Sequence, residues 1–229
     1  MKSLVLITAR KGSKGVWRKN SKLLAGKSLV SYTIEYAMNI SSPKHICVST
    51  DDQAIIEIAE GYGIDVPFIR PKELSSDTAT SYDVMLHALD FFEQKGIHFD
   101  NLILLQPTSP FRKEEHLIEA MKLYSKEIDL VLSVCVTKAN PYHVLFEENK
   151  LGFIERSKNL NTSRRQDVPI VYQANGSIYI FNTTSLRKYN SLNEFNKIVK
   201  FEMPHLFSVD IDDESDWDYC EYLIEKGLV

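Results

Sequence analysis

The stretch LVLITARKGSKG, residues 4–15, decides the fold class. Its first half, Leu4 to Thr8, is an apolar run that predicts a buried strand. Its second half is a basic loop, in which Gly12 and Gly15 permit tight turns and let backbone N–H groups approach a ligand closely. The sequence therefore predicts a strand that ends in a phosphate-binding loop, and the alternative is a solvated charged loop.

The charge distribution favours the phosphate interpretation. Between Arg10 and Lys22 there are six basic residues and no acid. Removing these six from the 27 basic residues leaves 21, against 31 acidic residues. One positive loop on an acidic body indicates a local anionic ligand rather than nucleic acid, which calls for a broad basic face. The loop matches neither G-x-x-x-x-G-K-[ST] nor G-x-G-x-x-G, so we expect it to wrap around a nucleoside triphosphate in another way.

Strand-like and helix-like segments alternate along the chain outward from this loop. Strands are expected at 4–8, 46–49, 66–69, 102–105, 130–136 and 177–181, and helices at 28–39, 51–60, 78–92, 114–124 and 213–225. This alternation predicts an α/β fold, a mainly parallel Rossmann-like sheet with helices on both faces. The length suits a single domain, residues 1–229. The pattern changes over 137–175, which we expect to form a surface excursion or an oligomerisation arm.

Polar residues recur where the expected strands end. They occupy residues 10–15, 49–51, 70, 106–112 and 210–212. Ligands of parallel sheets bind at the carboxyl ends of the strands, so these segments are expected to form a single site. In the turn at 106–112, Pro107 and Pro110 would hold Gln106 rigidly towards a ligand, and a plain turn is the alternative.

The segment Val209-Asp210-Ile211-Asp212 is a candidate metal site. On a strand, residues two apart share a face, so Asp210 and Asp212 would project together. Two carboxylates suit Mg²⁺, which also binds substrate phosphates and water. A solvated strand is the alternative. The acids at 213, 214 and 216 are expected mainly to cap the following helix.

Neither the start of the chain nor its cysteines indicate export. The apolar run at residues 4–7 is too short for a signal-peptide core or a membrane span. Cys47, Cys135 and Cys220 are far apart and form no C-x-x-C pair, so we expect reduced core thiols. A soluble, cytoplasmic protein without membrane or nucleic-acid partners is expected.

Taken together, these segments resemble the acylneuraminate cytidylyltransferases, also called CMP-sialic acid synthetases. Related enzymes act on legionaminic, pseudaminic and 3-deoxy-manno-octulosonic acids. The resemblance covers nearly the whole chain and rests on A-R-K-G-S-K-G at 9–15, K-N at 19–20, S-T-D at 49–51, R-P at 70–71, S-D-T-A-T-S at 76–81, L-Q-P-T-S-P at 105–110, N-G-S-I-Y at 175–179 and D-I-D at 210–212.

The resemblance implies a CTP-dependent enzyme, a magnesium ion and a homodimer whose arm completes the neighbour's sugar pocket. The implied triphosphate and ribose ligands are Arg10, Ser13, Lys19 and Asn20. The implied cytosine and ribose ligands are Arg70, Ala79 and Ser81. Gln106 would face the acidic keto-sugar, Arg165 would bind it, and Asp210 and Asp212 would bind Mg²⁺. Arg10, Lys19 and Asp212 would act in catalysis.

Two positions depart from the family pattern. Trp17 lies where many relatives have proline, which bears on the stiffness of the basic loop. Gln173 falls where some sialic-acid enzymes have an arginine beside the sugar. This departure argues against ordinary sialic acid and leaves legionaminic acid or a related sugar as an alternative substrate. Gln106-Pro107-Thr108 nevertheless resembles the sialic-acid branch.

The implied reaction is attack of the sugar's anomeric hydroxyl on the α-phosphorus of CTP, with release of pyrophosphate. Three alternatives remain at this stage. They are a sugar-1-phosphate nucleotidyltransferase, a glycosyltransferase with an Asp-x-Asp metal site, and a non-catalytic nucleotide-binding module.

Overall fold

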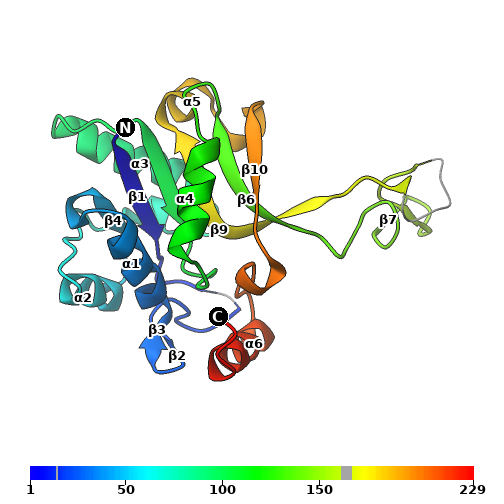
Figure 1. The fold of residues 1–229 in the computed structure, drawn as a ribbon, viewed down its shortest axis with the longest axis horizontal. Helices are drawn as coiled ribbons and strands as arrows, with labels where there is room; N and C mark the ends of the chain where they lie inside the picture. Colours follow the sequence, from blue (N-terminus) through cyan, green and yellow to red (C-terminus); the bar gives the residue numbers. More distant parts are fainter. Residues whose placement is uncertain (14, 161–166) are drawn as a thin grey trace.

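The computed structural model describes residues 1–13, 15–160 and 167–229. Its core is a six-stranded sheet of order β10-β6-β9-β5-β1-β4, with helices on both faces (Figure 1). The strands are β1 Ser3–Thr8, β4 Ile46–Ser49, β5 Asn101–Leu105, β6 Leu130–Val136, β9 Tyr172–Asn182 and β10 Ile198–Glu202. The helices are α1 Leu29–Ile40, α2 Gln53–Gly61, α3 Ser81–Gln94, α4 Glu114–Leu123, α5 Thr183–Lys188 and α6 Glu214–Glu225.

Strand β1 is covered on both faces because its side chains alternate between two cores. Val5 and Ile7 pack in one cluster with residues of α1, α2 and α4. Leu4 and Leu6 pack in the other with residues of α3 and α5. All four are essentially inaccessible to solvent. A strand that is covered on both faces needs apolar residues at successive positions. This explains why β1 lacks the alternation of apolar and polar residues that a half-exposed strand shows.

The sheet is mixed but mostly parallel, in agreement with the predicted α/β class. Strand β1 pairs in parallel with β4 and β5, and β10 pairs in parallel with β6. Strand β9 is antiparallel to both of its neighbours, β5 and β6. The carboxyl ends of β1, β4 and β5 therefore meet at one edge, where the polar segments after them gather.

Most predicted elements are confirmed, and two are wrong. The expected strand at 66–69 is reduced to one isolated bridge between Thr50 and Ile69. The segment 209–212 is not a strand either. It is held instead by a hydrogen bond from the Ile211 N–H to the carbonyl oxygen of Thr108, at 2.8 Å. The predicted acidic cap is confirmed, because Asp213 and Asp216 form a capping box at the start of α6.

Between β6 and β9 the chain leaves the sheet and forms a small antiparallel hairpin. Its strands are β7 Phe146–Glu148 and β8 Ile154–Arg156. Figure 1 shows the hairpin far from the sheet, at the end of two long connecting segments. Several large apolar side chains here are exposed, namely Leu145, Phe146, Leu151, Phe153, Ile154 and Ile170.

The remaining features agree with a core built from apolar packing. Cys47, Cys135 and Cys220 are free and buried, as expected for core thiols.

No helix within the described part of the chain has both the length and the apolar character needed to cross a membrane.

Candidate active site

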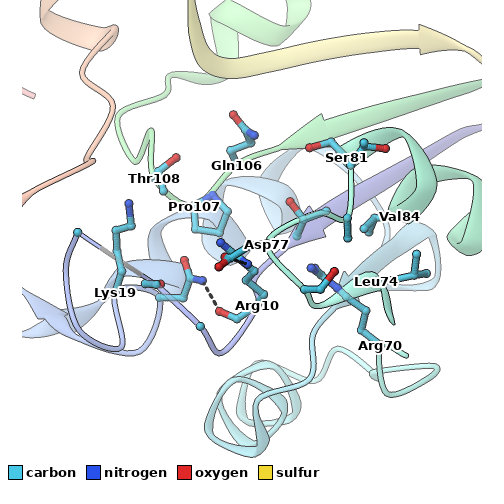
Figure 2. A pocket seen from close by; sticks show the side chains of 18 of the residues that line it. Arg10, Lys19, Arg70, Leu74, Asp77, Ser81, Val84, Gln106, Pro107 and Thr108 are labelled. Carbon is cyan, nitrogen blue, oxygen red and sulfur yellow. Dashed lines mark hydrogen bonds and ion pairs between the residues drawn. The ribbon is translucent and has the colours of Figure 1, made fainter. Parts of the chain in front are cut away.

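A cavity of about 390 Å³ opens at the edge where β1, β4 and β5 end. Four segments form its walls: the basic loop after β1, the region before and at the start of α3, the exit of β5, and Asp212 before α6. Figure 2 shows Lys19 and Thr108 at one end of the cavity and Arg70, Leu74 and Val84 towards the other.

All seven predicted nucleotide ligands line this one cavity. They are Arg10, Ser13, Lys19, Asn20, Arg70, Ala79 and Ser81. Gln106 and Asp212 line it as well. Segments as far apart in sequence as Arg10 and Asp212 are thus brought together around a single space, as expected for the carboxyl edge of such a sheet.

Lys19 connects the basic loop to the acidic segment at the other end of the chain. Its ammonium group donates a hydrogen bond to the carbonyl oxygen of Ile211 and lies 3.9 Å from a carboxylate oxygen of Asp212. The Lys19 side chain is only 12% exposed, whereas that of Asp212 is 85% exposed. A positive group held in place beside an accessible carboxylate can bind a phosphate oxygen or a cation–phosphate complex.

Gly15 is where the basic loop and the acidic segment touch. A Cβ atom added at this position would lie 1.9 Å from the carbonyl oxygen of Asp212. Gly12 has no such contact, since a Cβ there meets nothing within 4 Å. Glycine is therefore required at position 15 for close backbone approach, and Gly12 faces open space in the cavity wall.

Arg10 crosses the middle of the cavity and meets Asp77 from the loop before α3. The two side chains form an ion pair at 2.8 Å, and both are partly exposed. The Arg10 carbonyl oxygen accepts a hydrogen bond from the Asn20 side chain at 3.0 Å (Figure 2). Exposed ion pairs contribute only about 0–1 kcal/mol, so a phosphate group can compete for Arg10 at little cost.

Arg70 is buried, with 5% relative exposure. Its guanidinium group donates to the side-chain and main-chain oxygens of Ser49, at the end of β4. Burial lowers the pKa of Arg70 to about 10, and the positive charge of Arg10 lowers it as well, whereas Asp51 raises it. Two guanidinium groups close enough to repel each other favour an anionic or strongly polar ligand between them.

Gln106 and Asp210 converge on one point of β9. The φ angle of Gly176 is +71°, and a Cβ there would lie 3.0 Å from Oε1 of Gln106 and 3.2 Å from Oδ2 of Asp210. It would lie 2.5 Å from Oγ of Ser109, which donates hydrogen bonds to the Asn175 carbonyl oxygen and to Asp210. The absence of a side chain at Gly176 therefore leaves room for a carboxamide and a carboxylate to face the same space.

Asp210 and Asp212 are close enough for their charges to interact, although only Asp212 lines the cavity. Burial raises the pKa of Asp210, and the charge of Asp212 raises it further, while hydrogen bonds from Thr108 and Ser109 lower it. A divalent cation would relieve this repulsion between two oxygen ligands. No group of three or more His, Cys, Asp or Glu side chains gathers in the described residues, so the remaining ligands would have to come from substrate phosphates and water.

One predicted sugar ligand, Gln173, does not line the cavity of the single chain. Gln173 lies on β9 opposite Cys135 and is exposed. Arg165 lies outside the described residues. Conversely, Leu74, Asp77 and Val84 line the cavity, although no ligand role was expected for them from the sequence. Asp77 lies within the S-D-T-A-T-S motif at 76–81, so this motif could have identified it as a residue of the site.

We predict that Gly15→Ala weakens the binding of CTP. Its methyl group would collide with the Asp212 backbone and push the loop outward. Displacement of a positioned group by about 1 Å can cost on the order of 100-fold in rate, and we expect a loss of affinity of about 10-fold or more. Titration calorimetry measures this. Gly61→Ala is the matched control, because a Cβ there meets nothing within 4 Å. Equal CTP affinity of the two variants would contradict the assigned contact.

Comparison with known proteins agrees with this geometry. The cytidylyltransferase family matches residues 4–226. The CMP-N,N'-diacetyllegionaminic acid synthase of Legionella pneumophila is 33% identical over 98% of this chain and 97% of its own length. The N-acylneuraminate cytidylyltransferase of Escherichia coli is 35% identical over 98% of this chain, which spans about half (52%) of that longer protein.

A solved structure has the same fold. It is a CMP-2-keto-3-deoxy-manno-octonic acid synthetase complexed with CTP, with a TM-score of 0.69 and 18% identity over 99% of this chain and all of that one. The family match over nearly the whole chain and the two relatives above 30% identity lead to one conclusion. This chain belongs to the cytidylyltransferase family that includes the acylneuraminate cytidylyltransferases, and it is a nucleotidyltransferase.

Proposed function

We propose that the protein joins CTP to a nonulosonic acid of the N-acylneuraminate or legionaminate type, giving the CMP-sugar and pyrophosphate. The observation that carries this proposal is the single cavity lined by all seven predicted nucleotide ligands, with Gln106 and Asp212 on its walls. The 33% sequence identity to a legionaminic acid synthase, over 98% of this chain and 97% of that protein, supports the choice of sugar class.

In this proposal the nucleotide lies along the cavity from Arg70 to Lys19. The cytosine and ribose occupy the end formed by Arg70, Ala79 and Ser81, where donors and acceptors of the cavity wall can distinguish cytosine from uracil. Arg10 and Lys19, with Ser13 and Asn20, hold the triphosphate. Positive groups fixed along the phosphates stabilise the charge that develops on the departing pyrophosphate.

The acceptor sugar then lies on the side of Gln106 and Asp210. Its anomeric hydroxyl attacks the α-phosphorus in line, the bond from that phosphorus to the β-phosphate bridging oxygen breaks, and pyrophosphate leaves. We assign proton acceptance from the hydroxyl to Asp212, because its carboxylate is accessible and lines the cavity. Asp210 and Asp212 would hold Mg²⁺, which when bound withdraws electron density from the phosphate.

We further propose that the protein acts as a homodimer through residues 137–175. A hairpin that exposes Phe146, Phe153 and Ile154 far from the core of its own chain leaves apolar area that a second copy would cover. Gln173 and Arg165 are then contributed to the sugar side of the neighbouring site. Isologous pairing would build two equivalent sites.

The proposed reaction is tested by pyrophosphate release with each of the four nucleoside triphosphates and a panel of eight- and nine-carbon keto acids. We expect turnover with CTP and a nonulosonic acid, and a loss on the order of 100- to 1000-fold in Asp212→Asn, because one electrostatic group is removed with little change in volume. Asp218→Asn, an exposed position on α6, is the control. Near-normal activity of Asp212→Asn at saturating magnesium would reject the role of Asp212.

The same assay separates the alternatives. Equal use of UTP and CTP, or turnover only with a sugar 1-phosphate, would indicate a sugar-1-phosphate nucleotidyltransferase. Consumption of a nucleotide sugar without pyrophosphate release would indicate a glycosyltransferase. Nucleotide binding without any turnover would indicate a non-catalytic module.

A second prediction concerns Arg165 and the dimer. A buried carboxylate needs a cation, so Arg165→Ala should raise the KM for the sugar much more than that for CTP. Mixing this variant with Asp212→Asn subunits should restore part of the activity, because one site of each mixed dimer combines an intact core with an intact arm. Inactive mixtures, after subunit exchange has been verified by mass spectrometry, would show that Arg165 does not act across the interface.

A further inference from the structure

Arg112 lies behind the sugar side of the cavity, at the point where three elements meet. Its Nη2 donates a hydrogen bond to the main-chain oxygen of Gln106 at 2.6 Å, and its Nε donates to that of Ser177 at 2.9 Å. Its Nη1 donates to Oγ1 of Thr33 at 3.1 Å. One planar group thus joins the exit of β5, the middle of β9 and helix α1.

The partners of Arg112 are all neutral oxygens, which is unusual for a partly buried cation. Burial lowers the pKa of its guanidinium group to about 10, while Tyr36 and, to a smaller extent, Asp210 raise it. The desolvation of this cation is thus offset by three fixed hydrogen bonds rather than by an ion pair. Only a guanidinium group has donors spread widely enough in one plane to reach three separate acceptors.

Two of the residues that Arg112 holds, Gln106 and Ser177, lie at or next to the point on which Asp210 converges. Gln106 is fixed through its own carbonyl oxygen, so the direction of its carboxamide depends on that anchor. Ser177 directly follows Gly176, the point on which Gln106 and Asp210 converge. The hydrogen bonds of Arg112 therefore set both sides of this convergence, whereas Arg10 and Arg70 are held by Asp77 and Ser49.

We propose that Arg112 is a positioning residue that fixes Gln106 and the Gly176 segment of β9 for sugar binding. This inference rests on the proposed function, because it takes the Gln106 side of the cavity as the sugar side. Arg112 acts through the groups it holds and does not touch the reacting atoms. Its loss should therefore affect the sugar more than the nucleotide.

The kinetic test compares Arg112→Lys and Arg112→Ala with the wild-type protein. Lysine keeps the charge but cannot reach three acceptors. We therefore expect both variants to raise the KM for the sugar about 10-fold or more and to lower kcat. The magnitude follows because displacement of a positioned group by about 1 Å can cost about 100-fold in rate. The KM for CTP should change less than about 3-fold, well below that displacement effect. Lys113→Ala is the control, since Lys113 lines a second cavity together with Arg112 and its ammonium lies over the ring of Phe207.

A second measurement uses the cavity behind Arg112. This cavity, of about 620 Å³, is lined by Arg112, Tyr36 and Phe111 among others, so removal of the side chain leaves a guanidinium-sized space open to it. Added guanidinium ion at millimolar concentration should lower the sugar KM of Arg112→Ala and leave that of Lys113→Ala unchanged. If the substitution only destabilised the fold, added guanidinium would not selectively restore the KM for the sugar.

The outcomes are distinct. Equal changes in both KM values, wild-type kinetics in Arg112→Lys, or no rescue by guanidinium would overturn the proposal. If Arg112→Ala does not fold, which thermal unfolding shows, the split in KM values of Arg112→Lys decides alone. Wild-type protein without turnover on any nonulosonic acid would instead count against the proposed function.

Discussion

The backbone contact between Gly15 and Asp212 is the constraint on which the cavity depends. It brings together a loop near the start of the chain and a segment near its end, and no side chain fits between them. Lys19 can reach the carbonyl oxygen of Ile211 only because the two backbones approach so closely. Lys19 of the basic loop and Asp212 of the acidic segment are therefore held at a fixed separation in the cavity.

Apolar burial contributes more to this contact than the ion pairs beside it. Val16 and Ile211 are fully buried in one cluster, next to Trp217 of α6. Full burial of such a side chain stabilises by about 1.5–3 kcal/mol, whereas an exposed ion pair such as Lys22–Glu214 contributes about 0–1 kcal/mol. The loop is thus held by its apolar residues, and its charged groups remain available to a ligand.

The parts of the fold that could be predicted are those with a local pattern. The apolar runs of β1, β5 and β6 and the acidic cap of α6 are visible in the sequence because burial and capping act over a few residues. Strand β10 was not predicted, because its alternation of exposed and partly buried residues extends over only five positions, Ile198–Glu202, which is short for a periodic signal. The antiparallel direction of β9 depends on pairing with β5 and β6, which no local pattern records. In the site, the positions of Arg10 and Gln106 follow from the ends of β1 and β5, but the anchoring of Gln106 by Arg112 is a tertiary contact.

The central claim is that this cavity directs a sugar hydroxyl onto the α-phosphorus of CTP. The most direct test is ³¹P NMR of the products formed from CTP and a nonulosonic acid labelled with ¹⁸O at its anomeric hydroxyl. The account predicts one phosphodiester resonance that carries the isotope shift, together with unlabelled pyrophosphate. An unshifted phosphodiester resonance would show that the anomeric carbon–oxygen bond had broken, and the absence of any phosphodiester would show that no CMP-sugar forms. Either result would contradict the account.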